Sequence, residues 1–195
     1  MNIKEVEQLT DEQRISMIAE RMQEIITLLG DDTDREGLIK TPIRSAKALY
    51  YLTSGYRANA DEVMKSAIFK HEGSQVVMVR DIEFYSLCEH HVLPFFGKVS
   101  VAYIPNGSIV GLSKLARVVN ICARKLQVQE RLTREVCDIV KNALNAHGVI
   151  VKCEAEHLCM KMRGVEKQDS STITIDYNGA FCEDAELRRE ILSQL

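Results

Sequence analysis

The chain has 195 residues, enough for one domain or for one domain with an N-terminal appendage. Hydrophobic residues make up 46% of it, and the net charge of -3 gives no general attraction to nucleic acid or to an anionic membrane. No apolar run approaches the roughly 18 residues of a membrane helix, and the start has no apolar signal-peptide core. We therefore expect no nucleic-acid partner, no membrane association and a cytoplasmic location, in which cysteines stay reduced.

Helical patterns fill the first part of the chain. Thr10 followed by Gln13 resembles a capping box, and apolar residues then recur at helical spacing. A second helix is predicted from Thr41-Pro42, with Thr41 as the N-cap and Pro42 at the first helical position. A further short helix follows these two. The sequence therefore predicts an N-terminal helical region over residues 1–70.

The second part, residues 71–195, begins with the pattern of strands. Residues 75–87 are rich in β-branched and aromatic side chains, and residues 97–105 alternate between apolar and polar side chains. The two segments read as neighbouring antiparallel strands. The stretch Cys-Glu-His-His falls in the connection between them.

Two helices and two more strands follow. The first helix is predicted to have Ser113 as its N-cap, and the second is an amphipathic helix within residues 129–148. Residues 148–162 and 171–179 read as strands, and Asp184 begins a final helix. The order β-β-α-α-β-β predicts an α+β domain with a four-stranded antiparallel sheet.

Metal-type donors lie in two separate segments. Cys88 and His91 have the C-x-x-H spacing that lets two side chains converge on one ion. His157 and Cys159 are two residues apart, which on a strand would put both on one face. Three ligands and one open position are typical of a catalytic zinc, and two thiolates with an imidazole favour Zn²⁺ over Mg²⁺. The sequence therefore offers Cys88, His91 and Cys159 as donors for one zinc ion, with His90 and His157 nearby.

The same residue types also fit plainer roles. A cysteine and a histidine can pack in any core, and Cys122 and Cys137 occupy apolar helical positions. Cys153 would share a strand face with Cys159 and is interpreted as a packing residue. A structural zinc usually takes four protein ligands, in which case His157 or Cys153 would be the fourth.

Four segments, in this order and spacing, resemble the GTP cyclohydrolase I family: SLCEHHVLPFFGKVSVAYIP, GLSKLARVV, LQVQERLT and EHLCMKMRG. The resemblance covers residues 36–182. It implies a tunnelling fold (T-fold) and zinc on Cys88, His91 and Cys159. It also implies hydrolysis of GTP at C8, release of formate, rearrangement of the ribose and closure to 7,8-dihydroneopterin triphosphate.

The resemblance also implies roles for residues outside the zinc set. His90 and His157 match the family's acid/base histidines, since an imidazole titrates near neutrality. Glu130, with Gln129 beside it, matches the position that reads guanine, although a glutamate at a helix N-terminus is also favoured by the dipole alone. The matches to the triphosphate-binding residues are Arg44, Lys47, Ser113, Lys114, Arg117 and Arg163. Each of these cations, taken singly, also fits a solvated surface charge.

The family's assembly gives a further expectation. Its sheets close into a barrel-like pentamer, two pentamers stack into a decamer, and neighbouring subunits complete each pocket. A four-stranded sheet from one chain would leave two edges, which pairing between copies removes. We therefore expect a homo-oligomer of this kind with its sites at subunit interfaces.

Three other functions fit parts of the pattern. A nucleobase deaminase also uses His and Cys ligands, but it carries a C-x-x-C that this chain lacks. A non-enzymatic zinc module would need a fourth ligand. A relative with the same architecture that acts on another purine or pterin is the third alternative.

Overall fold

The computed structural model describes residues 2–195 and divides into two compact units. The first unit ends at Thr53 and the second is Ser54–Leu195. This division lies earlier in the chain than the predicted one between residues 70 and 71. The reason is packing: Met64, on helix α4 (Ala60–Lys65), is fully buried in the core of the second unit.

The first unit consists of helices α1 (Ile3–Glu7), α2 (Asp11–Leu28) and α3 (Thr41–Leu52). The predicted capping box is confirmed, because the Gln13 N–H donates to Thr10 Oγ1 at 3.3 Å and the Thr10 N–H donates to Gln13 Oε1 at 2.8 Å. The predicted N-cap of α3 is wrong by one residue. Lys40 already has helical dihedral angles and is the N-cap, so Thr41 is the first residue of the helix.

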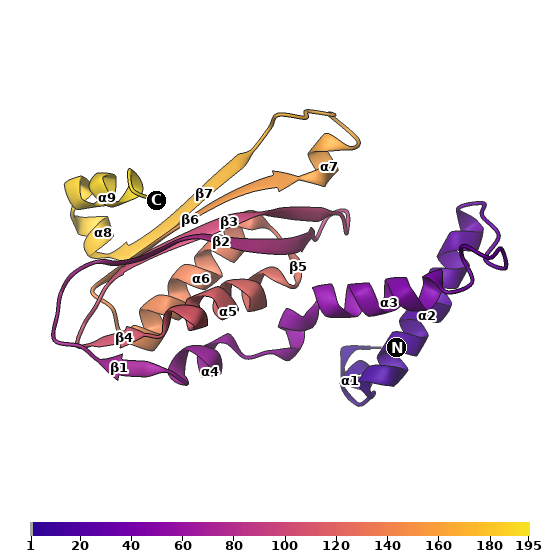
Figure 1. Cartoon of the computed structure of the whole chain (residues 1–195), viewed down its shortest axis with the longest axis horizontal. Coiled ribbons are helices and arrows are strands. Elements are labelled where there is room, and N and C mark those ends of the chain that lie inside the picture. Colours follow the sequence, from indigo (N-terminus) through magenta and orange to yellow (C-terminus); the bar gives the residue numbers. More distant parts are fainter. Residues whose placement is uncertain (1) are drawn as a thin grey trace. The chain divides into compact units, whose positions relative to one another are not determined.

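The second unit is built on a five-stranded sheet of order β5-β2-β3-β6-β7 (Figure 1). The four long strands are antiparallel, as predicted: β2 (Val77–Cys88), β3 (Pro94–Ile104), β6 (Gly148–His157) and β7 (Thr172–Gly179). The fifth strand, β5 (Leu126–Gln127), was not predicted and pairs in parallel with the end of β2. A separate ribbon joins β1 (Ile68–Lys70) to β4 (Ser108–Val110).

Helices cover the two faces of this sheet unequally. Figure 1 shows α5 (Leu112–Ala123) and α6 (Gln129–Leu144) along one face, where they form the main core with residues such as Val99 and Val101. The short helices α8 (Ala180–Glu183) and α9 (Ala185–Leu192) cover only one end of the other face. Asp184 caps α9, as predicted, by accepting hydrogen bonds from two backbone N–H groups at 2.9 Å. Within residues 54–195, no helix covers the rest of that face.

Three predicted boundaries in this unit are wrong. Ser113 is not an N-cap, because the first turn of α5 closes on Gly111, whose carbonyl accepts from the Lys114 N–H at 2.8 Å. Helix α6 ends at Leu144, before the predicted stop at Gly148, because its C-cap Asn145 has a left-handed conformation (φ 46°). Strand β6 ends at His157, where the chain turns into α7 (Leu158–Lys161) instead of continuing.

Among the described residues, no helix is both long enough and apolar enough to cross a membrane.

Candidate metal centre and its surroundings

The candidate site lies at the end of the sheet where three distant segments meet. Strand β2 ends at Cys88, which pairs with Gln127 of β5. Strand β6 ends at His157, which lies opposite Phe95 in the antiparallel register with β3. Helix α6 begins at Gln129, directly after β5. The sheet therefore gathers residues about 40 and 70 positions apart around one point.

Three side chains form a cluster of metal-type donors at this point. The ligand atoms of Cys88, His91 and Cys159 all lie within 4.8 Å of one another, and Cys88 Sγ is 3.8 Å from His91 Nδ1. Metal–ligand bonds of about 2.0 Å to nitrogen and 2.3 Å to sulfur give a tetrahedral S···N separation of roughly 3.5 Å. The cluster therefore has the dimensions of a site for one ion. The structure brings together the three residues that the sequence analysis singled out as ligands.

The position predicted for Cys159 is nevertheless wrong. The spacing predicts that His157 and Cys159 share one face of a strand, but Cys159 is the second residue of α7. The helical turn carries its thiol to Cys88, while His157 stays on β6 outside the cluster. Cys153 does not share a face with Cys159 either, and it is fully buried in the core.

His157 is held on two sides by the protein. Its ring stacks on Phe95 with 4.7 Å between centroids and 3° between planes. Its Nε2 atom is 2.8 Å from Gln129 Oε1. Desolvation lowers the pKa of His157, and the nearby Glu130 carboxylate acts in the opposite direction. His157 is therefore a half-buried imidazole with a fixed orientation.

The Gln129 amide determines which nitrogen of His157 carries the proton. Its Nε2 donates to the carbonyl of Cys153 at 3.0 Å and to that of Thr172 at 2.9 Å. Both amide hydrogens are thereby used, which fixes the orientation of the amide and leaves Oε1 as an acceptor facing the imidazole. In neutral His157 the proton is therefore on Nε2, and Nδ1 is the nitrogen that can accept a proton.

His90 lies next to Cys88 and is more exposed than His157. Its Nδ1 is 3.8 Å from Cys88 Sγ, and its Nε2 is 3.8 Å from Glu89 Oε1. The His90 and His91 rings meet edge to face, with 6.2 Å between centroids. Two imidazoles thus flank the three donors without belonging to the cluster of ligand atoms.

The predicted cations are distributed over three elements. Burial and the Cys88 thiol raise the pKa of Cys159, and the Arg163 guanidinium acts in the opposite sense, so its charge lies near the cluster. Within residues 2–195, no ion pair involves Lys114, Arg117 or Arg163. These cations are available to an anionic ligand.

Ser113, Lys114 and Arg117 do not lie beside the metal cluster of their own chain. They occupy the first turns of α5, whereas the last residue of that helix, Ala123, accepts a hydrogen bond from Ser86 of β2 at 2.6 Å. At 1.5 Å per residue, Lys114 lies about 14 Å up the helix axis from that contact. Arg44 and Lys47 lie on α3, in the first unit.

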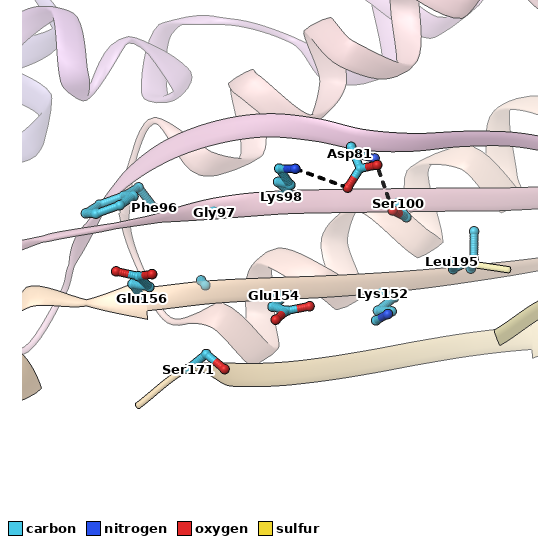
Figure 2. A pocket seen from close by; sticks show the side chains of 11 residues that line it. Asp81, Phe96, Gly97, Lys98, Ser100, Lys152, Glu154, Glu156, Ser171 and Leu195 are labelled. Atoms are coloured by element: carbon cyan, nitrogen blue, oxygen red, sulfur yellow. Dashed lines mark hydrogen bonds and ion pairs between the residues drawn. The ribbon is translucent and has the colours of Figure 1, made fainter. Parts of the chain in front are cut away.

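A cavity of about 390 Å³ lies elsewhere, on the open face of the sheet (Figure 2). It is lined by two lysines, Lys98 and Lys152, and by the carboxylates of Asp81, Glu154 and Glu156. Figure 2 shows Lys98 directed at Asp81, to which it is paired at 3.5 Å. Its cations are thus matched by carboxylates, so the cavity offers no net attraction to a triphosphate.

Two contacts at the site have no counterpart in the sequence analysis. Arg131 forms an ion pair with Glu89, and Phe95 stacks on His157. Both join residues from different elements, 42 and 62 positions apart, and no local spacing reveals such a pair. The only available signal was the position of Glu89 between the candidate ligands.

The fold and the site together define the class of protein: an α+β protein whose sheet carries a cluster of two thiols and one imidazole, flanked by two further imidazoles. A sequence model of the GTP cyclohydrolase I family matches residues 18–195. The chain therefore belongs to the GTP cyclohydrolase I family.

Curated relatives agree with this assignment. GTP cyclohydrolase 1 of Porphyromonas gingivalis is 50% identical over 186 residues, covering 95% of this chain and 96% of that protein. GTP cyclohydrolase 1 of Bacteroides thetaiotaomicron is 58% identical over 169 residues, covering 87% of this chain and 86% of that protein. GTP cyclohydrolase 1 2 of Pseudomonas aeruginosa is 52% identical over 169 residues, covering 87% and 93%.

The cysteines outside the cluster give a testable prediction. Burial raises the pKa of Cys122, Cys137 and Cys153 to about 12 each, so at pH 8 roughly one molecule in 10⁴ carries the reactive thiolate at any of them. We expect these three to resist iodoacetamide in the native protein and to react on unfolding, whereas exposed Cys182 reacts early. Peptide mass spectrometry measures this, and alkylation of Cys153 before unfolding would contradict it.

Proposed function

We propose that Cys88, His91 and Cys159 hold a zinc ion, and that His90 and His157 move protons beside it. The observation that carries the proposal is the convergence of the three ligand atoms within 4.8 Å. The activity of the GTP cyclohydrolase I family is the hydrolytic opening of the imidazole ring of GTP, with loss of formate and closure of a pterin ring. The chain has this activity, and the proposal concerns which of its residues perform it.

The chemistry of the donors fits zinc in an open, catalytic coordination. Two thiols and an imidazole are soft or borderline ligands that suit Zn²⁺. Neither candidate for a fourth ligand is in place: His157 lies outside the cluster of ligand atoms, and Cys153 is buried beside Thr133 and Thr174. Three protein ligands leave one position for water or substrate, and a bound zinc there would act as a Lewis acid and lower the pKa of that water.

We assign different proton-transfer roles to the two flanking imidazoles. His157 presents Nδ1 as its accepting nitrogen, because Gln129 holds the proton on Nε2. His90 is exposed and lies between the Cys88 thiol and the Glu89 carboxylate, where it can exchange protons with solvent. A substrate nitrogen such as guanine N7 needs a proton before C8 becomes electrophilic, and a positioned imidazole can supply it.

For the purine ring we propose that Glu130 accepts hydrogen bonds from N1–H and the 2-amino group of guanine. It is exposed, lies at the start of α6, and its charge reaches His157. Gln129, which the sequence analysis placed with the base-reading residues, has its amide fully engaged by Cys153, Thr172 and His157. We therefore propose that Gln129 orients His157 and does not contact guanine.

The triphosphate is proposed to bind a set of six residues: Arg44, Lys47, Ser113, Lys114, Arg117 and Arg163. The placement of Lys114 and Arg117 at the far end of α5 supports a pocket in which they serve the metal centre of a neighbouring subunit. Uncommitted cations at a helix start suit a phosphate chain, because backbone N–H groups and guanidinium groups both donate to its oxygens.

We propose a homo-oligomer, two stacked pentamers as in the family, with sites shared between subunits. Three features support assembly. Strand β7 pairs only with β6, and β5 covers only two residues of β2, so the described sheet has two edges. Ile173 and Ile175 of edge strand β7 are 53% and 43% exposed. Helix α2 buries none of its residues, and Leu28 and Leu29 at its end are 86% and 81% exposed.

A cytoplasmic location remains part of this proposal. None of the six cysteines is in a disulfide, which fits a reducing compartment.

The metal assignment predicts two classes of variant. Cys88→Ser, His91→Ala and Cys159→Ser should each lose both zinc and activity, while Cys182→Ser should keep both. His90→Ala and His157→Ala should keep the metal and lose roughly 10²–10⁴-fold in kcat, as expected for lost proton transfer. Metal is measured by atomic emission, and turnover by formate and by the fluorescence of the oxidised pterin. Full zinc in Cys159→Ser would remove that residue from the site.

The role of Glu130 predicts substrate selectivity. Glu130→Gln places an amide N–H against guanine donors and leaves at least one of them unpaired, at about 1–3 kcal/mol each. We expect kcat/KM for GTP to fall by roughly 10-fold or more, with zinc retained, and ATP to be a poor substrate of the parent protein. Glu154→Gln, on the open face of the sheet, is the matched control. Equal turnover of ATP and GTP by the parent protein would contradict base reading by Glu130.

The shared-site proposal predicts complementation. Light scattering should give a mass far above the 22.1 kDa of one chain. Mixed oligomers of two inactive variants, Cys88→Ser and Arg117→Ala, should regain activity because some pockets combine an intact metal centre with an intact cation set. A fully active monomer would refute shared sites, and so would inactive mixtures in which mixed oligomers had been demonstrated.

A further inference from the structure

The loop that carries the candidate ligand His91 has a strained backbone. It follows β2 and spans Glu89 to Leu93, and within it Val92 has a φ of 54°. This left-handed conformation is unfavourable for a β-branched residue. The Val92 N–H donates to the Cys88 carbonyl, and the Cys88 N–H donates to the Leu93 carbonyl, both at 2.8 Å. Such strain persists only where the surrounding structure holds it.

Glu89 is the residue through which the surrounding structure holds this loop. Its backbone N–H donates to the Gln127 carbonyl at 3.0 Å, and its carboxylate Oε2 accepts from Arg131 Nη2. Its other oxygen, Oε1, lies 3.8 Å from His90 Nε2. One carboxylate therefore joins helix α6 to the imidazole that follows it in the loop.

Arg131 is itself fixed by a buried amide. Its Nε donates to Oε1 of Gln127, a residue that is only 1% exposed. The Gln127 Nε2 donates to the Cys122 carbonyl at 3.0 Å and to Glu135 Oε2 at 3.3 Å, so the amide cannot turn. The Arg131 guanidinium is thus held through Nε by Gln127, which fixes the position of Nη2, the nitrogen that donates to Glu89. A mobile surface arginine would not have this anchoring.

We propose that Arg131 is a positioning residue that acts through Glu89 to hold the strained ligand loop, and with it His90 and His91, in the geometry that the metal centre needs. The proposal rests on the metal site of the proposed function. An exposed ion pair contributes little to global stability, so loss of Arg131 should leave the fold intact and disturb the site. The Arg131–Glu89 ion pair connects helix α6 to the loop that contains His91, a candidate ligand.

The test compares Arg131→Ala, Arg131→Lys and Glu89→Gln with a matched control, Arg134→Ala. Arg134 is one turn further along α6 and pairs with Asp176 at 3.4 Å, away from the loop. Affinity for Co²⁺ is measured from the thiolate-to-cobalt absorption in competition with a chelator. Hydrogen–deuterium exchange of the peptide covering residues 89–93 is measured on metal-free protein. Neither readout requires GTP turnover, so each remains informative if the proposed function fails.

For Arg131→Ala we expect a loss of about 10–100-fold in Co²⁺ affinity and in kcat, with KM for GTP changed no more than about 3-fold. Exchange at residues 89–93 should be faster than in the parent protein. Arg131→Lys should recover part of the loss, since an ammonium restores the charge but not the fork that bridges Gln127 and Glu89. Arg131→Ala combined with Glu89→Gln should be no worse than Arg131→Ala alone.

Parent-like Co²⁺ affinity and loop exchange in Arg131→Ala, as in Arg134→Ala, would overturn the proposal. If circular dichroism shows that Arg131→Ala does not fold, Glu89→Gln decides, because it keeps the size of the side chain and removes only its charge. Unchanged metal affinity and exchange in folded Glu89→Gln would then overturn it.

Discussion

The register between β3 and β6 is the constraint on which the site depends. Gly97 fixes it sterically: a Cβ atom there would lie 2.0 Å from the Glu154 carbonyl oxygen, so the backbone of β6 can approach this position only because the residue has no side chain. With Gly97 opposite Ala155, Phe95 comes opposite His157. A slip of one residue would turn His157 to the other face of the sheet, away from Gln129 and from the ring on which it stacks.

From this register the remaining parts of the site follow in sequence. The end of β6 fixes where α7 begins, and one helical turn then carries the Cys159 thiol to Cys88. The Gln129 amide forms hydrogen bonds to the Cys153 carbonyl of β6, to the Thr172 carbonyl of β7 and to the imidazole of His157. Three elements are thus joined by one buried side chain whose hydrogen-bonding capacity is filled.

Much of the fold could be predicted from the sequence, because most of its helices and strands have a local signal in composition, periodicity or a capping residue. Composition rich in β-branched and aromatic residues indicated β2, alternation indicated β3, helical spacing indicated α6, and Asp184 indicated the start of α9. The elements that were missed depend on tertiary contacts. Two-residue β5 exists only through its pairing with β2, and the turn into α7 interrupts a segment whose composition still resembles a strand. The end of the first compact unit at Thr53 also depends on such contacts, since Met64 packs into the core of the second unit.

For the site, the residue types were sufficient to predict the three candidate ligands that the structure brings together, but not the side chains around them. C-x-x-H spacing is a local feature, and Cys88 and His91 do converge. Cys159 also belongs to the cluster, although it lies on the helical turn α7 and not on the predicted strand. The roles of Gln129, Gln127 and Arg131 follow from which oxygen and which nitrogen each amide or guanidinium presents, and spacing along a chain does not contain that information.

The hydrogen bond from Gln129 to Thr172 has a thermodynamic consequence. Thr172 is the first residue of β7, and the outer side of that strand has no partner within the described residues. A chain that paired with this edge would restrain the same backbone that positions Gln129, and through it His157. Linkage is reciprocal. If assembly orders His157 and so strengthens substrate binding, bound substrate must stabilise the assembled state by the same free energy. Quaternary structure and substrate affinity would then be two measurements of one coupling free energy.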